Sequence, residues 1–410
     1  MGTAGAREIR MLKNVLMFLH DDRCHGSLNC FTDIYAAQFR KRGVNVNYIS
    51  LTDEPEEISR KLSELIGSTG IDAAISLNAC GEQDFTSGNS NLWDDIGVPF
   101  FNYIVDHPIE HGVDLNSKCD DYHVICLDQC HAEFIKKYYP KIKSVHALPL
   151  TGVGDISIPA DDRASFDARE YDVMITMGLI DPEETREKMK LLPEEIRQIM
   201  LDWADWMEEH LDSSPETALR EMLDHKFGKG SINDDVYFLI CGMGGLAVQY
   251  IRVWVRQRIV EKLIASGLCF HLCGGGWEKL MDRYPGNHVI LHGDIPMTQT
   301  DRLYRNTKLA INVLPMFKKG THDRIATAQI NGAAVLTDGN DFLRSLYKSG
   351  EIEYYDLSKP ETVADKIQRL LNDPEALYGI ATKGQVIARE NLSADEAGEK
   401  LIKIIESVTG

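Results

Sequence analysis

Short apolar runs alternate with amphipathic, helix-like stretches in the first third of the chain. The stretch FTDIYAAQFRKRG (31–43) has helical spacing, and Gly43 is expected to cap that helix. Further helices are predicted at about 54–67 and through HAEFIKKYY (131–139). The strands predicted around them are NVLMFL (14–19), VNVNYISL (44–51), IDAAISLN (71–78), VPFFNYIV (98–105) and HVICLD (123–128). Strands that alternate with helices form parallel sheets covered by helices, so this pattern predicts an α/β domain.

A second alternating series follows. Its predicted strands are YDVMITMG (171–178), VYFLI (236–240), LCFHLCGGG (268–276), HVILHG (288–293), LAINVLP (309–315) and AAVLTD (333–338). Between the first two of these, residues 181–228 have helical periodicity and charged faces, which predicts a helical insertion. Trp203 and Trp206 are interpreted as packing anchors of that insertion rather than as a binding platform. From about residue 360 onward the pattern is helical.

The two series are separated by residues 145–163, a stretch rich in Gly, Pro and Asp that we interpret as an interdomain linker. The sequence therefore predicts two doubly wound, Rossmann-like domains, residues 1–163 and 164–385, with a cleft between them. The last segment, 386–410, is predicted to form a helix that can pack back on the first domain. In such sheets ligands bind beyond the carboxyl ends of the strands.

Composition narrows the possible partners. The chain has 410 residues, 43% of them hydrophobic and 26% charged, and no apolar run approaches the roughly 18 residues that span a membrane. The N-terminal apolar segment stops at charged residues without a small-residue cleavage site, which predicts a strand and not a signal peptide. A formal net charge of -19 argues against nucleic acid and against anionic lipid. We therefore expect a cytoplasmic protein with a soluble partner, and a homo-oligomer is compatible with the sequence.

The cysteines give no clear metal signal. The nine cysteines contain no Cys-x-x-Cys pair. Cys126, Cys130 and His131, with His123 nearby, have a spacing that fits no common zinc pattern. We interpret the cysteines as buried thiols in a reducing cytoplasm and predict no metal site.

Two glycine-rich loops could hold an anion. In CGMGGLAVQYIRVWVRQR (241–258), glycines follow a predicted strand and precede a helix, where unpaired amides and the helix dipole favour negative charge. Arg252 and Arg256 lie one turn apart on that helix. The pattern Gly-x-Gly-x-x-Ala also meets the dinucleotide fingerprint, but the next predicted strand lacks the acidic residue that would hold a ribose. The second loop is CGGGWEKL (273–280), whose consecutive glycines allow close approach of backbone to a ligand or mark a tight turn.

The stretch MFKKGTHDRIATAQINGAAVLTD (316–338) is the third candidate. It predicts a loop, a small-residue helix, a turn at Asn-Gly and a strand. Gly320, Thr321 and His322 would present amides at the helix start, and Lys318, Lys319 and Arg324 add positive charge suited to a leaving diphosphate. The alternative is an ordinary strand-loop-helix-strand unit with solvated charges.

A different kind of site is predicted in the first domain. FFNYIVDHP (100–108) places Asp106 and His107 directly after a strand, where both side chains are expected to face the cleft. The structural alternative is that His107 only pins the turn before Pro108, with Asp106 capping it.

Taken in order, these segments resemble the two-domain glycosyltransferases of the GT-B fold, in particular the retaining family-4-like enzymes and the CgeB-like branch. RGVNVNYISL resembles the family's "rGHeV" strand, and VPFFNYIVDHP resembles the strand that ends in its active-site His. HALPLTGVGDISIP is similar to the "iPnGvD…F.P" linker, NHVILHGDIPMTQTDRLYRNTKLAINVLP to "v.f.G.v…el…y..adv.v.PS", and GAAVLTD to "G.PVv.td". The resemblance covers most of the chain.

The chain departs from the family at one point. The family-4 pattern has two glutamates here, the second of which grips the nucleotide ribose, and these positions are Lys319 and Thr327 in this chain. CgeB-like members have Asn-Glu-Arg where this chain has His322, Asp323 and Arg324. Ribose binding must therefore differ, through the Thr327 hydroxyl or another carboxylate.

The resemblance implies a metal-independent, retaining glycosyltransferase that takes a nucleoside-diphosphate sugar as donor, needs no cofactor and acts on a soluble acceptor, either a protein or a small molecule. The implied catalytic residues are His107, Asp106, Arg324 and Lys319. The implied nucleotide-sugar-binding residues are Gly26, Gly244, Arg252, Gly275, Gly276, Ile295, Gly320, Thr321, His322, Asp323 and Thr327. Three alternatives stay open: a nucleotide-sugar epimerase, a dinucleotide-dependent enzyme of similar fold, and a non-catalytic sugar-nucleotide binding or scaffold protein.

Overall fold

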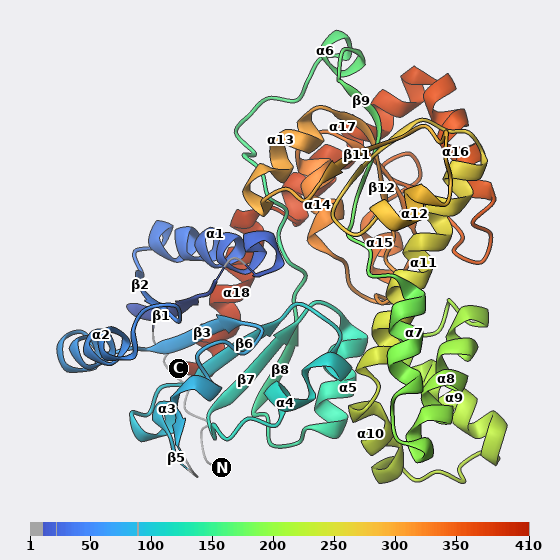
Figure 1. Ribbon diagram of the computed structural model, residues 1–410. Coiled ribbons are helices and arrows are strands. Elements are labelled where there is room, and N and C mark those ends of the chain that lie inside the picture. The colour runs from blue at the N-terminus through green and yellow to red at the C-terminus, as the bar shows by residue number, and fades with distance from the viewer. Residues whose placement is uncertain (1–10, 22, 88–89, 410) are drawn as a thin grey trace, which may run out of the picture. The chain divides into compact units, whose positions relative to one another are not determined.

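The computed structural model describes residues 11–21, 23–87 and 90–409 (Figure 1). The chain forms two compact units, each built around its own sheet. Unit 1 contains the residues up to Thr151 together with those from Ala394 onward, and unit 2 contains Gly152–Ser393. The chain thus passes between the units at 151/152 and 393/394, where the sequence predicted 163/164 and 385/386. The two six-stranded parallel sheets confirm the predicted α/β fold class.

The sheet of unit 1 has the strand order β2-β1-β3-β6-β7-β8, and every neighbouring pair is parallel. Its strands are β1 (Asn14–Leu19), β2 (Asn45–Ser50), β3 (Ala73–Leu77), β6 (Phe100–Ile104), β7 (Tyr122–Cys126) and β8 (Ser144–Ala147). All residues of β3, β6 and β7 are buried, as expected for strands covered on both faces. Strand β8 lies in what we interpreted as linker, because four residues at a sheet edge carry too little periodicity to be recognised.

Four longer helices cover the sheet of unit 1: α1 (Ser27–Lys41), α2 (Pro55–Ser68), α5 (Gln129–Tyr138) and α18 (Ala394–Thr409). Gly43 has φ of 78° just beyond α1, which is the left-handed conformation expected of a helix cap. The shorter elements are η1 (Arg23–Gly26), η2 (Gln83–Phe85), β4 (Thr86–Ser87), β5 (Ser90–Asn91), α3 (Leu92–Asp95), η3 (Pro108–His111) and α4 (Gly112–Leu115).

The C-terminal helix α18 packs on α1 of unit 1. A side chain at Gly398 would come within 2.5 Å of Gln38, so glycine is what allows the two helices to approach this closely. Lys41 and Asp395 form an ion pair of 2.7 Å across the same contact. The end of the chain is therefore part of the first unit, although unit 2 precedes it in sequence.

The sheet of unit 2 has the strand order β11-β10-β9-β12-β13-β14, again with every pair parallel. Its strands are β9 (Tyr171–Thr176), β10 (Phe270–Cys273), β11 (Val289–Gly293), β12 (Thr307–Asn312), β13 (Ala334–Asp338) and β14 (Glu353–Tyr355). The order reverses between β9 and β12, which creates a crevice at the carboxyl ends of these strands. The three-residue strand β14 was not predicted.

One predicted strand is wrong. Residues 236–240, VYFLI, belong to helix α10 (Asp234–Gly242). Asn233 caps this helix by accepting a hydrogen bond from the Val236 amide at 2.9 Å. The buried positions Tyr237, Ile240 and Cys241 follow helical spacing, and a five-residue apolar run cannot by itself distinguish a buried strand from a helix.

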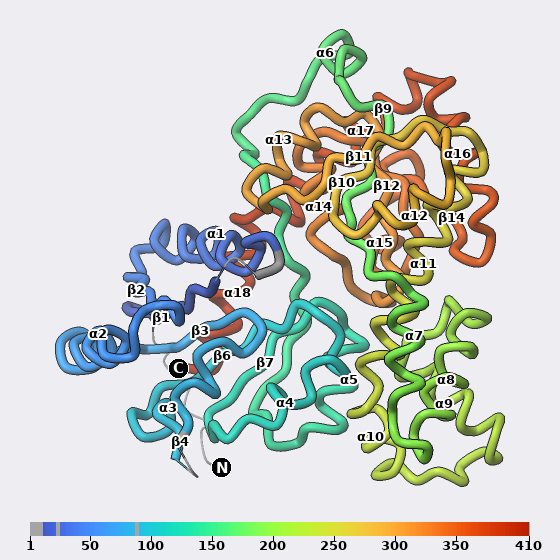
Figure 2. The backbone as a smooth tube through the Cα atoms, in the orientation of Figure 1, coloured from blue at the N-terminus to red at the C-terminus, as the bar shows by residue number. Residues whose placement is uncertain are grey.

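The helical insertion is consequently longer than predicted. Its helices are α7 (Pro182–Lys190), α8 (Glu194–Glu209), α9 (Pro215–Phe227), α10 and the start of α11 (Gly245–Ala265). Figure 2 shows these helices grouped together, with α11 running from them along the rest of unit 2. The Trp203 ring is fully buried and donates through Nε1 to the Pro215 carbonyl at 3.0 Å, which confirms it as a packing anchor.

No single helix in the described part of the chain has the length and apolarity to cross a membrane, and α10 with α11, bent by 62°, meets that criterion only as a pair.

The other helices of unit 2 are α6 (Arg163–Asp167), α12 (Glu278–Asp282), η4 (Met297–Gln299), α13 (Thr300–Arg305), α14 (Asp323–Ile330), α15 (Asp341–Leu346), α16 (Thr362–Asn372) and α17 (Pro374–Asn391). Helix α17 packs on α14 and on β13. The buried Arg169 side chain donates to the carbonyls of Thr307 and Gly332, at 2.6 and 2.8 Å, and so ties the start of β12 to the turn after α14. These contacts fix α14 relative to the crevice.

Candidate functional site

The stretch 316–338 folds as predicted, and α14 begins at the carboxyl edge of the unit 2 sheet. His322 occupies the N-cap position, Asp323 starts the helix, and Thr321 before them is fully buried. Burial alone would raise the pKa of the Asp323 carboxyl, but the charge of His322 and its hydrogen bond, followed by the charge of Arg324, outweigh burial and lower it. Asp323 is thus a structural anion inside the helix start, paired with His322.

Arg324 is held in place by the ends of three strands. Its Nε donates to Oδ1 of Asn312 at 3.1 Å, and Nδ2 of Asn312 donates to Oγ1 of Thr337 at 3.0 Å. The Tyr355 hydroxyl donates to the Asn312 carbonyl at 2.8 Å. Among the described residues, none accepts a hydrogen bond from the two terminal nitrogens of Arg324, whose side chain is half-buried. This arrangement leaves a fixed guanidinium with two donor groups available to an anion.

The three glycines after β10 are needed for packing. A side chain at Gly276 would lie 1.9 Å from the Leu179 carbonyl oxygen, and one at Gly274 would lie 2.5 Å from that of Met177. Both glycines have positive φ, 87° and 130°. The Leu179 amide donates to the Gly275 carbonyl at 3.0 Å, which joins this loop to the segment that follows β9. The structure therefore explains these glycines without a ligand, and Gly275 and Gly276 as nucleotide-binding residues stay a prediction.

A carboxylate that the sequence analysis missed lies beside this loop. Asp294, which directly follows β11 and precedes Ile295, accepts a hydrogen bond from the Gly275 amide at 2.5 Å. A carboxylate at this sheet edge suits hydroxyl or N–H donors rather than phosphate oxygens. The signal for it in the sequence was an acidic residue immediately after a strand, in HGDIP.

The glycine-rich stretch 241–245 is not a strand-to-helix loop, and its predicted position at the sheet edge is wrong. It is the break between α10 and α11, inside the helical insertion. Gly244 lies under the Trp203 ring, where a side chain would come within 2.3 Å. Arg252 lies about two turns into α11. One turn further along, Nη1 of Arg256 donates to the Gly178 carbonyl after β9 at 3.1 Å. Arg256, rather than Arg252 or Gly244, is the member of this stretch that lies at the sheet edge.

Thr327 has a structural partner. Its side chain is 1% exposed, and its hydroxyl accepts a hydrogen bond from the Val153 amide at 3.0 Å. Nδ2 of Asn331 donates to the Val153 carbonyl at 2.8 Å, so α14 fastens the segment that enters unit 2. A side chain at Gly152 would lie 2.6 Å from the backbone of Ala326. The Thr327 hydroxyl thus has a structural role, and its contact with a ribose stays a prediction.

In unit 1, the structure places Asp106 and His107 in different surroundings. His107 is 3% exposed, and its Nδ1 accepts a hydrogen bond from the Ile109 amide at 3.3 Å, so it caps η3. Its ring packs edge-on against His131, with centroids 4.5 Å apart. Nδ1 of His107 thus accepts a hydrogen bond from backbone, and the contact of His107 with a donor sugar stays a prediction.

Asp106 lies close to His111, a residue that the sequence analysis did not consider. Oδ2 of Asp106 accepts from Nδ2 of Asn78 at 3.3 Å and lies 3.9 Å from Nε2 of His111, while Nδ1 of His111 contacts Oδ2 of Asp114 at 2.7 Å. Burial would lower the pKa of His111, but the hydrogen bonds with Asp106 and then Asp114 outweigh it and raise the pKa to about 9. His111 is thus a cation at neutral pH.

The adjacent strand end in unit 1 is conformationally strained. Asn78 and Ala79 follow β3 and have φ of 51° and 59°, in the left-handed region that non-glycine residues seldom adopt. The Ala79 amide donates to Asn102 Oδ1 at 2.7 Å, and the Val105 amide donates to Asn78 Oδ1 at 2.9 Å. Such strain costs on the order of 1–3 kcal/mol and is concentrated at functional sites.

The remaining predicted residues are distributed over both units. Gly26 has φ of 71° and precedes α1, so it lies at a strand-to-helix connection of unit 1. Lys319, Gly320 and Ile295 lie in loops at the carboxyl edge of the unit 2 sheet, and Nδ2 of Asn340 donates to the Gly320 carbonyl at 2.9 Å. Most of the predicted nucleotide-sugar-binding residues thus follow strands at the carboxyl edge of the unit 2 sheet. The exceptions are Gly26 in unit 1, Gly244 and Arg252 in the insertion and α11, and the buried Thr327 within α14.

Comparison with known proteins gives two findings. Residues 252–402 match the family model described as Glycosyl transferase-like. The whole chain is similar in structure to sucrose-phosphate synthase from Thermosynechococcus elongatus, at 10% identity over 96% of this chain and 98% of that one, with a TM-score of 0.55. It is also similar to Anabaena HepE in complex with UDP-glucose, at 12% identity over 96% and 99%, with a TM-score of 0.54. Comparison with curated proteins gives no match.

A third similar structure is AviGT4, a glycosyltransferase involved in avilamycin A biosynthesis, at 11% identity over 97% of this chain and 98% of that one, with a TM-score of 0.50. At these identities the likeness shows the fold, and it does not address the family-4-like or CgeB-like subtype. The predicted GT-B fold is confirmed, and over residues 252–402 the family match supports the predicted resemblance to glycosyltransferases. The chain has the GT-B fold, and its residues 252–402 match the Glycosyl transferase-like family model.

Proposed function

We propose that this protein transfers a sugar from a nucleoside-diphosphate sugar to an acceptor, and that the departing diphosphate binds at the start of α14. Arg324 carries the proposal, because Asn312 fixes its Nε at the sheet edge while its two terminal nitrogens have no partner among the described residues. A charge held in place before the reaction stabilises a leaving group without reorganisation. The N-terminus of α14 adds a positive partial charge at the same place.

In this proposal no metal ion is needed, since Arg324, Lys319 and the helix dipole supply the positive charge that a divalent cation supplies elsewhere. The resemblance implies retention of configuration at the transferred sugar. A soluble acceptor, either a protein or a small molecule, fits the net charge of -19.

Asp294 takes the role that the missing family glutamate would have. Its carboxylate holds the Gly275 amide and lies at the same sheet edge as Gly320, where it can accept hydrogen bonds from the nucleoside. We expect Asp294→Asn to weaken UDP binding about tenfold, which corresponds to about 1.4 kcal/mol. The UDP dissociation constant from calorimetry measures this. Unchanged affinity would remove Asp294 from the site and leave the Arg324 assignment intact.

The first donor to test is UDP-glucose, because the structurally similar HepE was solved with UDP and with UDP-glucose. The experiment follows three quantities: UDP released with and without candidate acceptors, interconversion of the donor sugar, and thermal stabilisation by UDP. A ligand at about 100 times its dissociation constant stabilises by roughly 2.7 kcal/mol. Acceptor-dependent UDP release supports transfer.

The other outcomes favour the alternatives. An epimerised donor indicates a nucleotide-sugar epimerase, and stabilisation by a dinucleotide indicates a dinucleotide-dependent enzyme. Binding of UDP-sugars without turnover on any acceptor indicates a sugar-nucleotide binding or scaffold protein.

A further inference from the structure

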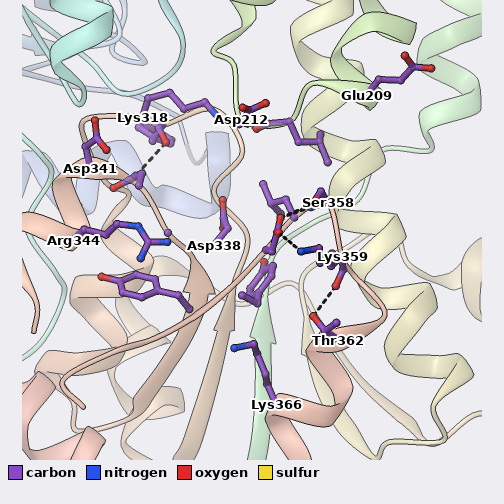
Figure 3. A pocket seen from close by; sticks show the side chains of 18 of the residues that line it. Glu209, Asp212, Lys318, Asp338, Asp341, Arg344, Ser358, Lys359, Thr362 and Lys366 are labelled. Atoms are coloured by element: carbon purple, nitrogen blue, oxygen red, sulfur yellow. Dashed lines mark hydrogen bonds and ion pairs between the residues drawn. The ribbon is translucent and has the colours of Figure 1, made fainter. Parts of the chain in front are cut away.

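A pocket of about 1030 Å³ opens in unit 2 at the carboxyl ends of β13 and β14 (Figure 3). Its floor contains Asp338 and Tyr355, the last residues of these two strands, and the start of α16 forms one wall. The helical insertion contributes another wall through Glu209 and Asp212. The volume is that of a small-molecule site. The pocket lies at the opposite end of the strand order from Gly275 and Asp294, and of the β12–α14 loop only Phe317 and Lys318 line it.

The lining of this pocket contains both cations and carboxylates, and three of its cations have no ion-pair partner in the part of the chain that the structure describes. Arg344, Lys366 and Arg369 line it, and none of the three forms an ion pair with a carboxylate among the described residues. The Arg344 guanidinium lies over the Tyr354 ring, 4.5 Å from its centroid. Acidic side chains are in excess in this chain, whose formal net charge is -19, so three unpaired cations around one cavity favour an anionic ligand.

The lining also offers hydrogen-bond acceptors. In Figure 3, Lys366 and the acidic pair Glu209 and Asp212 lie on opposite sides, with Asp338 between them. Asp338 is 6% exposed, and burial raises the pKa of its carboxyl to about 6. Carboxylates accept hydrogen bonds from hydroxyl groups but repel a fully anionic ligand. The lining therefore fits a ligand with hydroxyl groups at one end and a phosphate at the other.

The pocket floor is bonded to the loop between β12 and α14. Nδ2 of Asn340 donates to the carbonyls of Phe317 and Gly320, at 3.1 and 2.9 Å. Oδ1 of Asp338 accepts from the Leu314 amide at 2.6 Å. Nζ of Lys318, which also lines the pocket, donates to the Leu211 carbonyl of the insertion at 2.9 Å. A ligand that contacts Asp338 and Lys318 would thus act on the loop that leads to Arg324.

We propose that this pocket binds a phosphorylated sugar and that its occupancy changes the affinity of the β12–α14 loop for a nucleoside diphosphate. The phosphate contacts Lys366, Arg369 and Arg344, and the sugar hydroxyls contact the carboxylates of the strand ends and of the insertion. In this proposal the helical insertion completes the binding site, because Glu209, Leu211 and Asp212 form one of its walls. This binding does not depend on the proposed transfer reaction.

Calorimetry on the full chain tests the binding step. The probes are glucose 6-phosphate, glucose 1-phosphate and fructose 6-phosphate, compared with glucose and with inorganic phosphate. At least one hexose phosphate is expected to bind about tenfold more tightly than glucose and than phosphate. The proposal is overturned if no hexose phosphate shows saturable binding, and its sugar part is overturned if phosphate alone binds as tightly.

A charge-reversal pair locates the site. Lys366→Glu is expected to weaken hexose phosphate binding about tenfold or more. The matched control is Lys383→Glu, an exposed position on α17 outside the pocket, which is expected to leave binding within about twofold of wild type. Equal effects of the two substitutions would mean that the ligand binds elsewhere.

The coupling is tested by titrating UDP with and without saturating hexose phosphate. A change of at least about threefold in the UDP dissociation constant is expected, and UDP must change hexose phosphate affinity by the same factor. Unchanged UDP affinity overturns the coupling. Hexose phosphate binding in a protein that binds no nucleotide supports the pocket and contradicts the proposed function.

Discussion

The cations at the carboxyl edges of the two sheets differ in their partners. In unit 2, Asn312 orients Arg324 through Nε, and the terminal nitrogens of that guanidinium have no partner among the described residues. In unit 1, the cation of His111 lies 2.7 Å from Oδ2 of Asp114 and 3.9 Å from Oδ2 of Asp106. Two six-stranded parallel sheets thus present a cation available to a ligand in one unit and a cation already beside two carboxylates in the other. The proposed function places anion binding in unit 2, and this difference predicts which substitutions affect function and which affect stability.

The largest effect is expected from Arg324→Ala. Losing one charge-assisted contact costs about 1.5–3 kcal/mol, so donor-dependent turnover is expected to fall by about 10- to 150-fold while the melting temperature is kept. Steady-state kinetics with UDP-glucose measure this. The control is Arg283→Ala, which removes an exposed arginine that pairs with Glu261 at 2.7 Å. Wild-type turnover in Arg324→Ala would contradict the proposal that Arg324 at the unit 2 sheet edge binds the departing diphosphate.

Thr327→Val separates structure from ligand binding within unit 2. It leaves the buried Val153 amide without an acceptor, which costs about 1–3 kcal/mol of unfolding free energy. Thr327→Ser keeps the hydroxyl and is expected to recover most of that loss. Denaturant unfolding and UDP titration are measured on both variants. A variant that melts normally but binds UDP weakly would restore Thr327 as a ribose ligand.

His107→Asn tests the catalytic prediction in unit 1. An asparagine side chain can still accept the Ile109 amide hydrogen bond, so the variant is expected to melt close to the wild type. If the imidazole contacts the donor sugar, turnover falls at least about tenfold, or about 1.4 kcal/mol. Turnover equal to wild type would show that capping η3 is the whole role of His107.

The smallest effect is a pH dependence of stability that originates in unit 1. The pKa of His111 is raised to about 9 in the folded state, so its contribution to stability is fully present below its ordinary value of 6.5 and is lost as pH rises through 9. Chemical unfolding of the full chain between pH 6 and pH 9.5 measures this loss. His111→Gln is expected to have a flatter profile over the same range, with UDP affinity unchanged. If the unfolding free energies of variant and wild type changed with pH in parallel, His111 would not be the source of the pH dependence.

The predictable parts of the fold are those with a repeated local pattern. Strand β1 was predicted at Asn14–Leu19, its observed bounds, and the β12–α14–β13 connection was predicted in its order. Strands β8 and β14 were missed because four and three residues carry too little pattern. Residues 236–240 were assigned to a strand because a short apolar run has no distinguishing period.

The residues of the candidate site also differ in whether they could be predicted from local sequence. Arg324 was found because a cation at a predicted helix start is visible in the chain itself. Asp294 and His111 were missed as functional candidates because their importance comes from neighbours distant in sequence or across a turn. The pocket beside β13 and β14 was missed because its walls come from the insertion, two strand ends and α16.

The sequence by itself determined that the chain forms parallel sheets covered by helices, and that one loop with basic residues precedes a helix at a sheet edge. Periodicity and turn residues act over a few neighbours, so they can be read along the chain. Only the tertiary structure decided that Gly244 packs against Trp203, that Thr327 holds Val153 and that Arg256 reaches Gly178. Thr327 and Val153 are 174 positions apart and Lys41 and Asp395 are 354 apart, and no local pattern specifies such partners.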